Sequence, residues 1–319
     1  MNVRPLLLGT LTALTVSVLI IGLTPPIDDF NPENPHWNGL SEFFGKFNCI
    51  LWETPRSPNS KSTAFLIIGP STTFTSSDIE TIKGYLEDGG LLVVADDFGS
   101  ANELLEALGV NVRINGSLLL DPLFKYRSSV LPKAKFGGGE VILNYASIVE
   151  GRGFQVLARS TKFSYLDLNG NMKFDKGEPS TSFPVAVRIK YGKGDLIVIS
   201  DSSIFVNSML KLGDNINFVK HILTGRKIVV DASHWTPSPF SRAKNILIRA
   251  FNVLKIPEAR YVLAILITAA FFRLRFKAKP YSGEASPIEE TLNKHPNWNR
   301  HTLEMLEEDL RIGGKKGNR

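Results

Sequence analysis

Short apolar segments alternate with helical segments through this chain, and that alternation limits the possible folds more than any other feature of the sequence. The segments at 64–69 (AFLIIG), 91–95 (LLVVA) and 195–200 (DLIVIS) have the length and composition of buried strands. A serine followed three residues later by glutamate begins a helix after each of the first two segments. Strands joined through helices by short turns predict a parallel sheet whose faces are covered by helices.

The middle of the chain, residues 112–190, has a different pattern. Short β-branched runs such as 140–145 (EVILNY), 154–159 (FQVLAR) and 184–192 (PVAVRIKYG) lie between turns rich in Gly, Pro and Asn. Runs of this kind predict antiparallel hairpins. The fold class predicted from the whole pattern is α/β, a parallel sheet with inserted antiparallel hairpins.

Two apolar runs outside this region predict membrane spans. Residues 6–23 carry no charge and would form a helix about 27 Å long, which is enough to cross a bilayer. No small-residue cleavage site follows them, so they predict an uncleaved signal anchor. Residues 261–272 alone are short for a span, and a buried core helix is the alternative. A span over 257–276 forms if the side chains of Arg260 and Arg273 extend toward the membrane–water interface. The basic residues after this run predict that both termini are cytoplasmic.

The charge distribution agrees with a nearly neutral α/β region between two basic membrane flanks. The net charge is +6, and no basic patch with interleaved aromatic residues occurs in the α/β region, so nucleic-acid binding is not expected. The single cysteine, Cys49, excludes an internal disulfide. The predicted parts are a transmembrane signal anchor at 1–23, a stalk at 24–38, an extracytoplasmic α/β domain at 39–235, a juxtamembrane amphipathic helix at 236–256, a second transmembrane helix at 257–276 and a cytoplasmic tail at 277–319 with a helix over 298–311.

Residues 167–178 (DLNGNMKFDKGE) form the stretch whose residue types and spacing most favour a specific ligand. Side chains with oxygen atoms stand at positions 1, 3, 5, 9 and 12, as in an EF-hand calcium loop, where position 7 contributes its backbone carbonyl. Position 6, normally glycine, is Met172, and the flanking segments are typical of strands. A hairpin loop without metal is the alternative. The predicted ligands of a structural Ca²⁺ ion are Asp167, Asn169, Asn171, Lys173 through its carbonyl, Asp175 and Glu178.

Three acids follow predicted strands at the edge where open α/β sheets bind ligands, namely Asp96, Asp97 and Asp201. Grouped carboxylates can hold a metal or perform acid–base chemistry, and capping of the following helices is the alternative. Asp231 and His234 form a second possible pair, for which a structural role is the alternative. The sequence contains no nucleophile elbow, phosphate-binding glycine loop or zinc signature.

Several segments together resemble a known family. They are NPHWNGLSEFF, LIIGPSTTFTSSDIETIKGYLEDGGLLVVADDFGSANELLEALGV, the 167–178 loop and GDLIVISDSSIFVNSMLKLGDNINFVKHIL. In this order they resemble the membrane family called domain of unknown function 4350. The resemblance implies a flavodoxin-like, class I glutamine-amidotransferase-like fold without known activity, similar to the extracytoplasmic domains of auxiliary proteins of gliding-type ABC transporters. It also implies protein partners such as an AAA ATPase of the MoxR type or a von Willebrand A-like protein.

An amidotransferase requires an activated cysteine on a strand-to-helix turn. Cys49 opens a strand ahead of the core, so glutaminase activity is not expected. The leading hypothesis is a membrane-anchored, extracytoplasmic binding or scaffold protein without catalytic activity that carries a structural calcium loop. The alternatives are a metal-dependent hydrolase that uses Asp96, Asp97 or Asp201, and an auxiliary subunit of a transporter or ATPase-linked membrane assembly.

Overall fold

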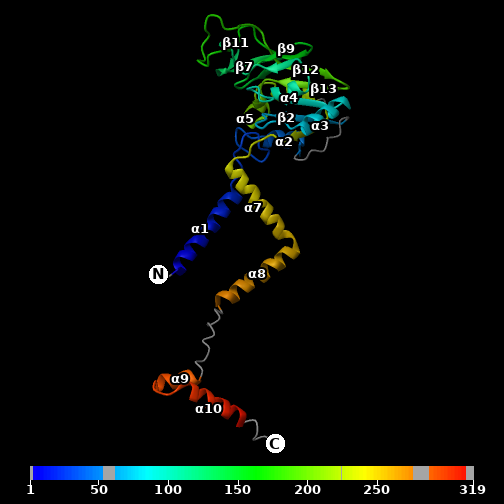
Figure 1. Ribbon diagram of the computed structural model, residues 1–319. Helices are drawn as coiled ribbons and strands as arrows, with labels where there is room; N and C mark the ends of the chain where they lie inside the picture. The colour runs from blue at the N-terminus through cyan, green and yellow to red at the C-terminus, as the bar shows by residue number, and fades with distance from the viewer. Residues whose placement is uncertain (1–2, 53–61, 224, 276–286, 314–319) are drawn as a thin grey trace. The chain divides into compact units, whose positions relative to one another are not determined.

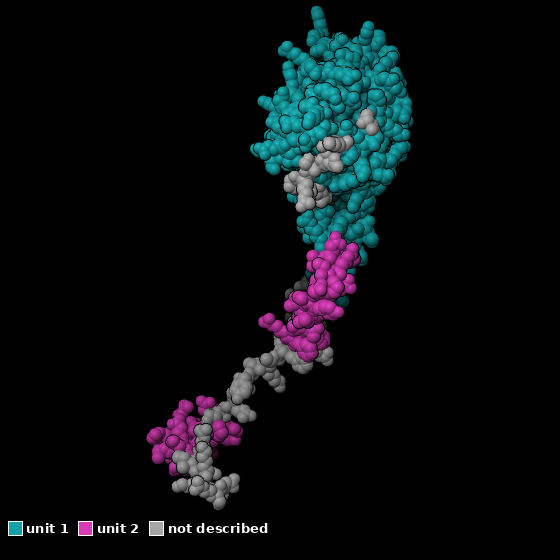
Figure 2. Space-filling model, turned by 90° about the vertical axis from the view of Figure 1, so that its right-hand side faces the viewer, with its two compact units in different colours: residues 1–249 teal, residues 250–319 magenta. Residues whose placement is uncertain are grey.

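The computed structural model describes residues 3–52, 62–223, 225–275 and 287–313. The chain divides into two compact units, residues 1–249 and residues 250–319 (Figure 2), and each is described by itself. Residues 55–62 are polar, and their composition predicts a loop ahead of the strand at 64–69; this segment lies almost wholly outside the described residues. So does the start of the predicted tail, at 277–286.

The first unit is built on one ten-stranded mixed sheet. Within the sheet region of this unit, Figure 1 shows β7 and β11 on one side and β2, α2 and α3 on the other. The strands lie side by side in the order β1 (Ile50–Trp52), β14 (Lys227–Asp231), β2 (Thr63–Ile68), β3 (Leu91–Ala95), β13 (Gly194–Ile199), β12 (Pro184–Tyr191), β10 (Gln155–Ser160), β7 (Ser128–Phe136) and β6 (Lys125–Tyr126), and β8 (Gly139–Ile142) pairs with β7.

The first five strands of this order, from β1 to β13, are parallel. Every residue of β2 and β3 is buried, as expected for strands covered on both faces. Register pairs Ile68 of β2 with Ala95 of β3, and Ala95 with Ile199 of β13. The carboxyl ends of these three strands therefore meet at one edge of the sheet.

Beyond β13 the sheet continues with antiparallel strands. β13 pairs along its whole length with β12, from Ile199 opposite Ala186 to Gly194 opposite Tyr191. The expected hairpins thus extend the main sheet and are not a separate insertion. Two small antiparallel sheets complete this half, one of β5 (Leu118–Leu120) with β11 (Tyr165–Asp167) and one of β4 (Val112–Ile114) with β9 (Val149–Gly151).

Alternating side chains of each central strand enter two apolar clusters, one on each face of the sheet. Leu66 of β2 lies in the first cluster with Phe43 and Phe218, whereas Phe65 lies in the second with Tyr85 and Leu104. The first face is covered by α2 (Ser41–Phe47), the 3₁₀ helix η1 (Ser202–Phe205), α5 (Asn207–Leu210) and α6 (Asn215–Leu223), and the second by α3 (Ser76–Glu87) and α4 (Asn102–Ala107).

The remaining helices are α1 (Val3–Leu23) and α7 (Pro239–Lys255), and then α8 (Pro257–Arg275), α9 (Pro287–Lys294) and α10 (Arg300–Gly313). The two predicted spans form α1 and α8. Across the ranges that the structure describes, however, none of the helices combines the length and the apolar character that a bilayer crossing requires.

This finding overturns the prediction of two flanking transmembrane helices, and with it the predicted cell-membrane location with an extracytoplasmic domain and cytoplasmic termini. The predicted fold class is corrected accordingly. The first unit is mixed α/β, as expected, but it has a single large mixed sheet in place of a flavodoxin-like or amidotransferase-like parallel sheet between membrane helices.

Candidate functional site

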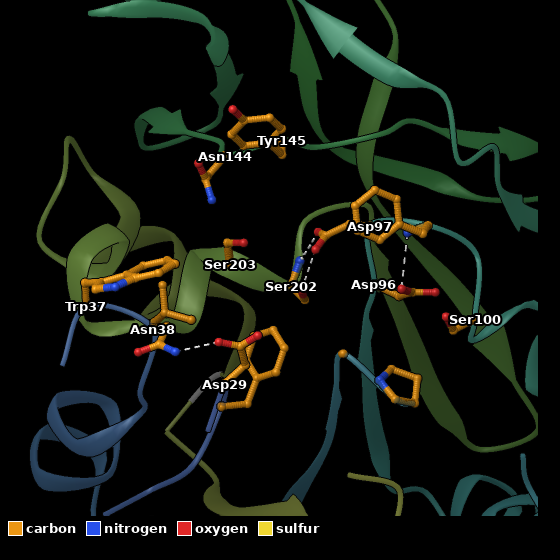
Figure 3. A pocket seen from close by; sticks show the side chains of 15 residues that line it. Asp29, Trp37, Asn38, Asp96, Asp97, Ser100, Asn144, Tyr145, Ser202 and Ser203 are labelled. Atoms are coloured by element: carbon orange, nitrogen blue, oxygen red, sulfur yellow. Dashed lines mark hydrogen bonds between the residues drawn. The ribbon is translucent and has the colours of Figure 1, made fainter. Parts of the chain in front are cut away.

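A pocket of about 320 Å³ lies at the carboxyl edge of the parallel strands (Figure 3). The turns that follow β2, β3 and β13 form its floor, as is usual for ligand sites in open α/β sheets. Its lining residues come from five segments of the chain and are Asp29, Phe30, Trp37, Asn38, Gly69, Pro70, Asp96, Asp97, Phe98, Ser100, Asn144, Tyr145, Ser202, Ser203 and Val206.

One wall of this edge pocket is the segment at 24–38, which was expected to be a stalk. Asn207 holds it in place, because its side-chain amide donates hydrogen bonds to the carbonyls of Asn34 (3.0 Å) and His36 (2.6 Å). Phe30 has a φ of +57° and packs against Gly69. A Cβ atom on Gly69 would lie 2.5 Å from the Phe30 ring, so only glycine permits this approach.

The structure brings two of the three predicted acids, Asp96 and Asp97, into the edge pocket. Asp97 accepts hydrogen bonds from the backbone N–H of Ser202 (2.6 Å) and from its hydroxyl (2.7 Å). Asp96 accepts from the N–H of Ala101 (2.8 Å) and from the N–H of Phe98 (3.3 Å), and so caps the turn before α4. Both carboxylates therefore have partners within the protein.

The third acid, Asp201, is fully buried beneath the pocket and does not line it. Its carboxylate accepts hydrogen bonds from the N–H groups of Asn144 and Ser203, both at 2.8 Å, and caps η1. Asp201 thus ties the Asn144 segment to the end of β13. The capping alternative describes its contacts well.

Burial changes the proton affinity of two of these acids. Burial raises the pKa of Asp97 to about 6, and the negative charge of Asp96 raises it further. The two hydrogen bonds from Ser202 lower the pKa, but by less. Burial also raises the pKa of Asp201 well above its ordinary value, and the charge of Asp97 adds to this effect. At neutral pH the floor of the pocket therefore holds a carboxylate that is close to its titration range.

The upper walls of the pocket are aromatic and polar. Trp37 (70% exposed), Tyr145 (46%) and Phe98 (72%) present ring surface around the opening. Among the described residues, neither the indole N–H of Trp37 nor the hydroxyl of Tyr145 nor the amide of Asn144 has a hydrogen-bond partner, and Figure 3 shows these side chains around the cavity. The fifteen lining residues include no Lys, Arg or His.

The second predicted pair, Asp231 and His234, lies outside the edge pocket. His234 Nδ1 is 2.6 Å from an Asp231 oxygen, its Nε2 is 3.6 Å from an Asp78 oxygen, and Phe74 stacks on the ring at 4.0 Å. Burial alone would lower the pKa of His234, but the hydrogen bonds and charges of Asp231 and Asp78 raise it overall. Since Asp78 also caps α3 with Thr75, this imidazole joins the end of β14 to the start of α3.

The predicted calcium loop, residues 167–178, lies in the antiparallel half of the unit and not at the edge pocket. Asp167 accepts hydrogen bonds from the N–H groups of Gly170 and Met172, both at 2.7 Å. Met172, at the position that EF-hand loops give to glycine, has a φ of +59°. The loop therefore makes its turn in the left-handed conformation at the expected position, although the residue there is not glycine.

Amide side chains satisfy the exposed carboxylate of this loop. Asn169 and Asn171 both donate to one oxygen of Asp175, at 2.8 and 2.6 Å, and these bonds lower the pKa of Asp175. Glu178 accepts from the N–H groups of Leu168 and Asp175, both at 3.0 Å. Within the described parts of the chain, no group of three or more His, Cys, Asp or Glu side chains is placed to hold a metal ion.

Cys49 does not provide a nucleophile. Burial raises the pKa of its thiol to about 12, so the thiol is protonated at neutral pH. Its sulfur lies 3.8 Å from the carbonyl of Phe43, on the face of α2 that packs into the first apolar cluster.

Sequence reasoning missed Asp29, Trp37, Asn38 and Tyr145 as site residues. The first three lie in the segment that composition assigned to a stalk, and only the long-range contacts of Asn207 bring it over the sheet. Tyr145 has a φ of +52°, which no local sequence signal predicts for an aromatic residue.

More than half of the chain matches a known family. A family model described as domain of unknown function (DUF4350) matches residues 32–223. No match to a curated protein was found. The similar solved structures include the mmIFT52 N-terminal domain, with 16% identity over 50% of this chain and 74% of that chain and a TM-score of 0.40.

Two further similar structures are glycosidases. They are the beta-galactosidase from Bacillus circulans sp. alkalophilus, with 13% identity over 51% of this chain and 23% of that chain and a TM-score of 0.31, and the alpha-L-fucosidase isoenzyme 2 from Paenibacillus thiaminolyticus, with 16% identity over 50% and 24% and a TM-score of 0.31. The chain thus spans less than a quarter of either enzyme. At these low TM-scores the likenesses say nothing about what this chain does.

Proposed function

Because this chain belongs to the DUF4350 family, a domain of unknown function, we propose its role from its own residues, as a non-catalytic binding protein that holds a small organic cation in the edge pocket. The observation that carries the proposal is the composition of the lining. Three carboxylates, those of Asp29, Asp96 and Asp97, line a cavity that has no Lys, Arg or His in its walls. Such a cavity repels anions and attracts cations.

The aromatic walls favour the same ligand class. A cation over the face of Trp, Tyr or Phe gains about 0.5–2 kcal/mol, and aromatic cages of this kind recognise quaternary ammonium groups. Phe30 and Tyr145 both have positive φ values and both line the pocket. Backbone conformations of this cost concentrate at ligand sites, where they hold side chains in place before binding.

The hydrogen bonds that Asp96 and Asp97 accept within the protein support binding without catalysis. Both oxygens of Asp97 accept hydrogen bonds from Ser202, and both oxygens of Asp96 accept from backbone N–H groups. A general base needs an oxygen that can reach a substrate proton. These carboxylates contribute charge to the cavity, and the volume of about 320 Å³ is at the small end of the range for ligand pockets.

Calorimetric titration of the full chain with choline tests the proposal, because choline has an uncharged isostere, 3,3-dimethyl-1-butanol. We expect choline to bind at least about tenfold more tightly than the isostere, which corresponds to about 1.4 kcal/mol. Tyr145→Leu and Asp97→Asn should each weaken choline binding. Phe174→Leu, which removes an exposed ring in the 167–178 loop, is the matched control and should leave it unchanged. Equal affinity for choline and the isostere, or no binding of choline at millimolar concentration, would refute the cation pocket.

The raised pKa of Asp97 favours a second candidate function, an acid–base hydrolase. A carboxyl group that titrates near pH 6 can donate a proton at mildly acidic pH. The metal-dependent form of this hypothesis has no support in the described residues, where no three ligating side chains are grouped. Hydrolysis of p-nitrophenyl acetate by the full chain, rising below pH 6 and lost in Asp97→Asn, would favour the enzyme. Activity that is the same in Asp97→Asn would count against it.

A structural calcium ion in the 167–178 loop is part of the proposed function. The specific observation in its favour is the φ of +59° at Met172, because the loop turns where a calcium loop turns. Burial raises the pKa of Tyr165, and the charges of Asp167, Glu178 and Asp175 raise it further. The charges of three predicted ligands thus act on one phenol. Because no three such side chains are grouped as metal ligands among the described residues, calcium binding would require these carboxylates to move closer together.

A further inference from the structure

A larger cavity, of about 470 Å³, adjoins the edge pocket. Asp29, Phe30 and Gly69 line both cavities, so the two share part of their walls. We call the larger one the adjoining cavity. All of its lining residues belong to the first unit. The others that line it are Ile27, Asp28, Ser71, Trp235, Thr236 and Ser238.

The carboxylate of Asp29 lines both cavities and has an oxygen that a ligand can reach. One of its oxygens accepts a hydrogen bond from the side-chain amide of Asn38 at 2.5 Å. In the part of the chain that the structure describes, the other oxygen has no hydrogen-bond or ion-pair partner, and the residue is exposed. Asp96 and Asp97 differ, because each of their oxygens already accepts a hydrogen bond from the protein. Asp29 is therefore the carboxylate best placed to accept from a donor group on a ligand.

The two cavities have carboxylates on two different segments. Asp96 and Asp97 follow β3 at the floor of the edge pocket, whereas Asp29 stands on the segment that forms its wall (Figure 3). Asp28 adds charge only, because one of its oxygens is buried and the other accepts from the N–H of Ser238 at 3.3 Å. The residues that line the two cavities include no Lys, Arg or His. A ligand with one positive charge therefore offsets only part of the repulsion among these carboxylates.

Apolar side chains provide much of the remaining lining. Phe30 lines both cavities, Pro70 lines the edge pocket, and Ile27 and Trp235 line the adjoining cavity. The indole N–H of Trp235 donates to the carbonyl of Ile68 at 2.6 Å, which fixes the ring in the cavity wall. Surface of this kind suits methylene groups, and the faces of Phe and Trp rings also attract cations.

We propose that the edge pocket and the adjoining cavity together bind a linear aliphatic diamine, a chain of methylene groups with an ammonium group at each end. This inference rests on the cation pocket proposed above and extends its ligand from one positive charge to two. One ammonium group lies at the floor beside Asp96 and Asp97. The other reaches the adjoining cavity and donates to the free oxygen of Asp29. A primary ammonium has the N–H donors that this oxygen accepts, which a quaternary ammonium lacks.

Calorimetric titration of the full chain with terminal diamines, from diaminopropane to diaminooctane, tests the proposal against the monoamine of each chain length. We expect at least one diamine to bind at least about tenfold more tightly than its monoamine. Affinity should be highest at one chain length, because the two groups of carboxylates are held at a fixed separation. Diamines that bind no more tightly than monoamines, or with an affinity independent of length, would overturn the proposal. Choline binding in that case would leave the cation pocket standing, whereas failure of choline and of every diamine would refute both.

Variants identify the site. Asp29→Asn removes a charge but keeps an oxygen for the amide of Asn38, so the protein should stay folded. It should reduce the advantage of the diamine over the monoamine at least about tenfold. Asp175→Asn, titrated without calcium, removes one carboxylate from the 167–178 loop and is the matched control, which should keep the advantage. An equal loss in both variants would assign the preference to the net charge of the protein and overturn the proposal. A folded Asp29→Asn protein with the full advantage would overturn it as well.

Discussion

The carboxyl edge of the sheet and the 167–178 loop are both rich in carboxylates, but their carboxylates lie in opposite environments. At the edge, burial raises the pKa of Asp97 and of Asp201. In the loop, Asp175 is exposed, and hydrogen bonds from Asn169 and Asn171 lower its pKa. The edge therefore holds acids at a cost in desolvation, whereas the loop stabilises its acid as an anion.

This difference separates two uses of the same residue type. Edge carboxylates are held by rigid strands and by backbone N–H groups, so they stay in place when a ligand enters or leaves. In the loop, backbone N–H groups also hold Asp167 and Glu178. Asp175, however, is held by two amide side chains, which can exchange their hydrogen bonds for contacts to a cation. The edge thus suits reversible binding of an organic cation, and the loop suits a structural metal ion.

The largest expected effect is on stability, when a buried edge acid is removed. Asp201→Ala leaves the N–H groups of Asn144 and Ser203 without an acceptor, and we expect a loss of about 2–5 kcal/mol in the free energy of unfolding. Asp175→Ala removes only exposed contacts and should have a much smaller effect. Urea denaturation of both variants measures the difference. Similar losses of unfolding free energy in the two variants would contradict the difference between buried edge carboxylates and exposed loop carboxylates.

The second prediction concerns the sign of the pH dependence. The pKa of Asp97 is about 6 in the folded protein against an ordinary value of 3.8, so its contribution to stability is fully present below pH 3.8 and is lost as the pH rises through 6. The shift corresponds to at most about 3 kcal/mol. Stability should therefore decrease between pH 5 and pH 7, and Asp97→Asn should remove that part of the decrease.

Asp175 is the control, because its contribution to stability changes with pH in the opposite direction. Its pKa is lowered in the folded protein, so its contribution is present above the ordinary pKa of an aspartate and is lost as the pH falls through the lowered value. Asp175→Asn should leave the pH 5–7 profile unchanged. Urea midpoints measured at pH 5, 6 and 7 for both variants decide the matter, and a flat wild-type profile that Asp97→Asn does not alter would contradict the assignment.

Part of this comparison is predictable from the sequence. Asp96, Asp97 and Asp201 follow apolar strands, and the parallel register then places their backbones at one edge of the sheet. The oxygen pattern of the 167–178 loop is also visible in the sequence. In both cases the signal is local, because strand periodicity and turn chemistry act over a few residues.

The rest depends on contacts between distant parts of the chain. The segment at 24–38 has the composition of a stalk, and its place over the sheet depends on Asn207, more than a hundred residues away in sequence. The direction of β12 beside β13 decides that the sheet is mixed, and hairpin signals alone do not fix which strand a hairpin joins. The positive φ values of Phe30 and Tyr145 follow from packing, not from residue type.

A third prediction tests the loop as a metal site. With calcium at tenfold excess over its dissociation constant, the folded state gains about 1.4 kcal/mol. This gain corresponds to a rise of about 3–6 °C in melting temperature for a unit of this size. Thermal unfolding of the full chain with calcium and with chelator should show the rise, and the double variant Asp167→Ala, Glu178→Ala should not. Asp97→Asn is the matched control at the edge and should keep the calcium effect. Identical melting temperatures of the wild type in calcium and in chelator would rule out the site.

The smallest expected effect comes from the backbone of the same loop. Met172 is 51% exposed and has a φ of +59°, a conformation that glycine adopts without the cost that a side chain brings. Met172→Gly should therefore stabilise the protein by up to about 1 kcal/mol, less the entropy that glycine adds to the unfolded chain. Met172→Ala separates the loss of the side chain from the change in backbone freedom, and it should not stabilise.

Met172 in the loop and Tyr145 at the edge have the same kind of backbone conformation but different roles. Tyr145 has a similar φ, +52°, but its ring lines the edge pocket, so Tyr145→Gly should weaken choline binding even if the backbone relaxes. In the loop, the same relief of strain should favour calcium, because a glycine at position 6 is what calcium loops use. Calorimetric titration of Met172→Gly with calcium measures this, and an affinity lower than that of the wild type would show that Met172 holds the loop in a conformation unrelated to metal binding.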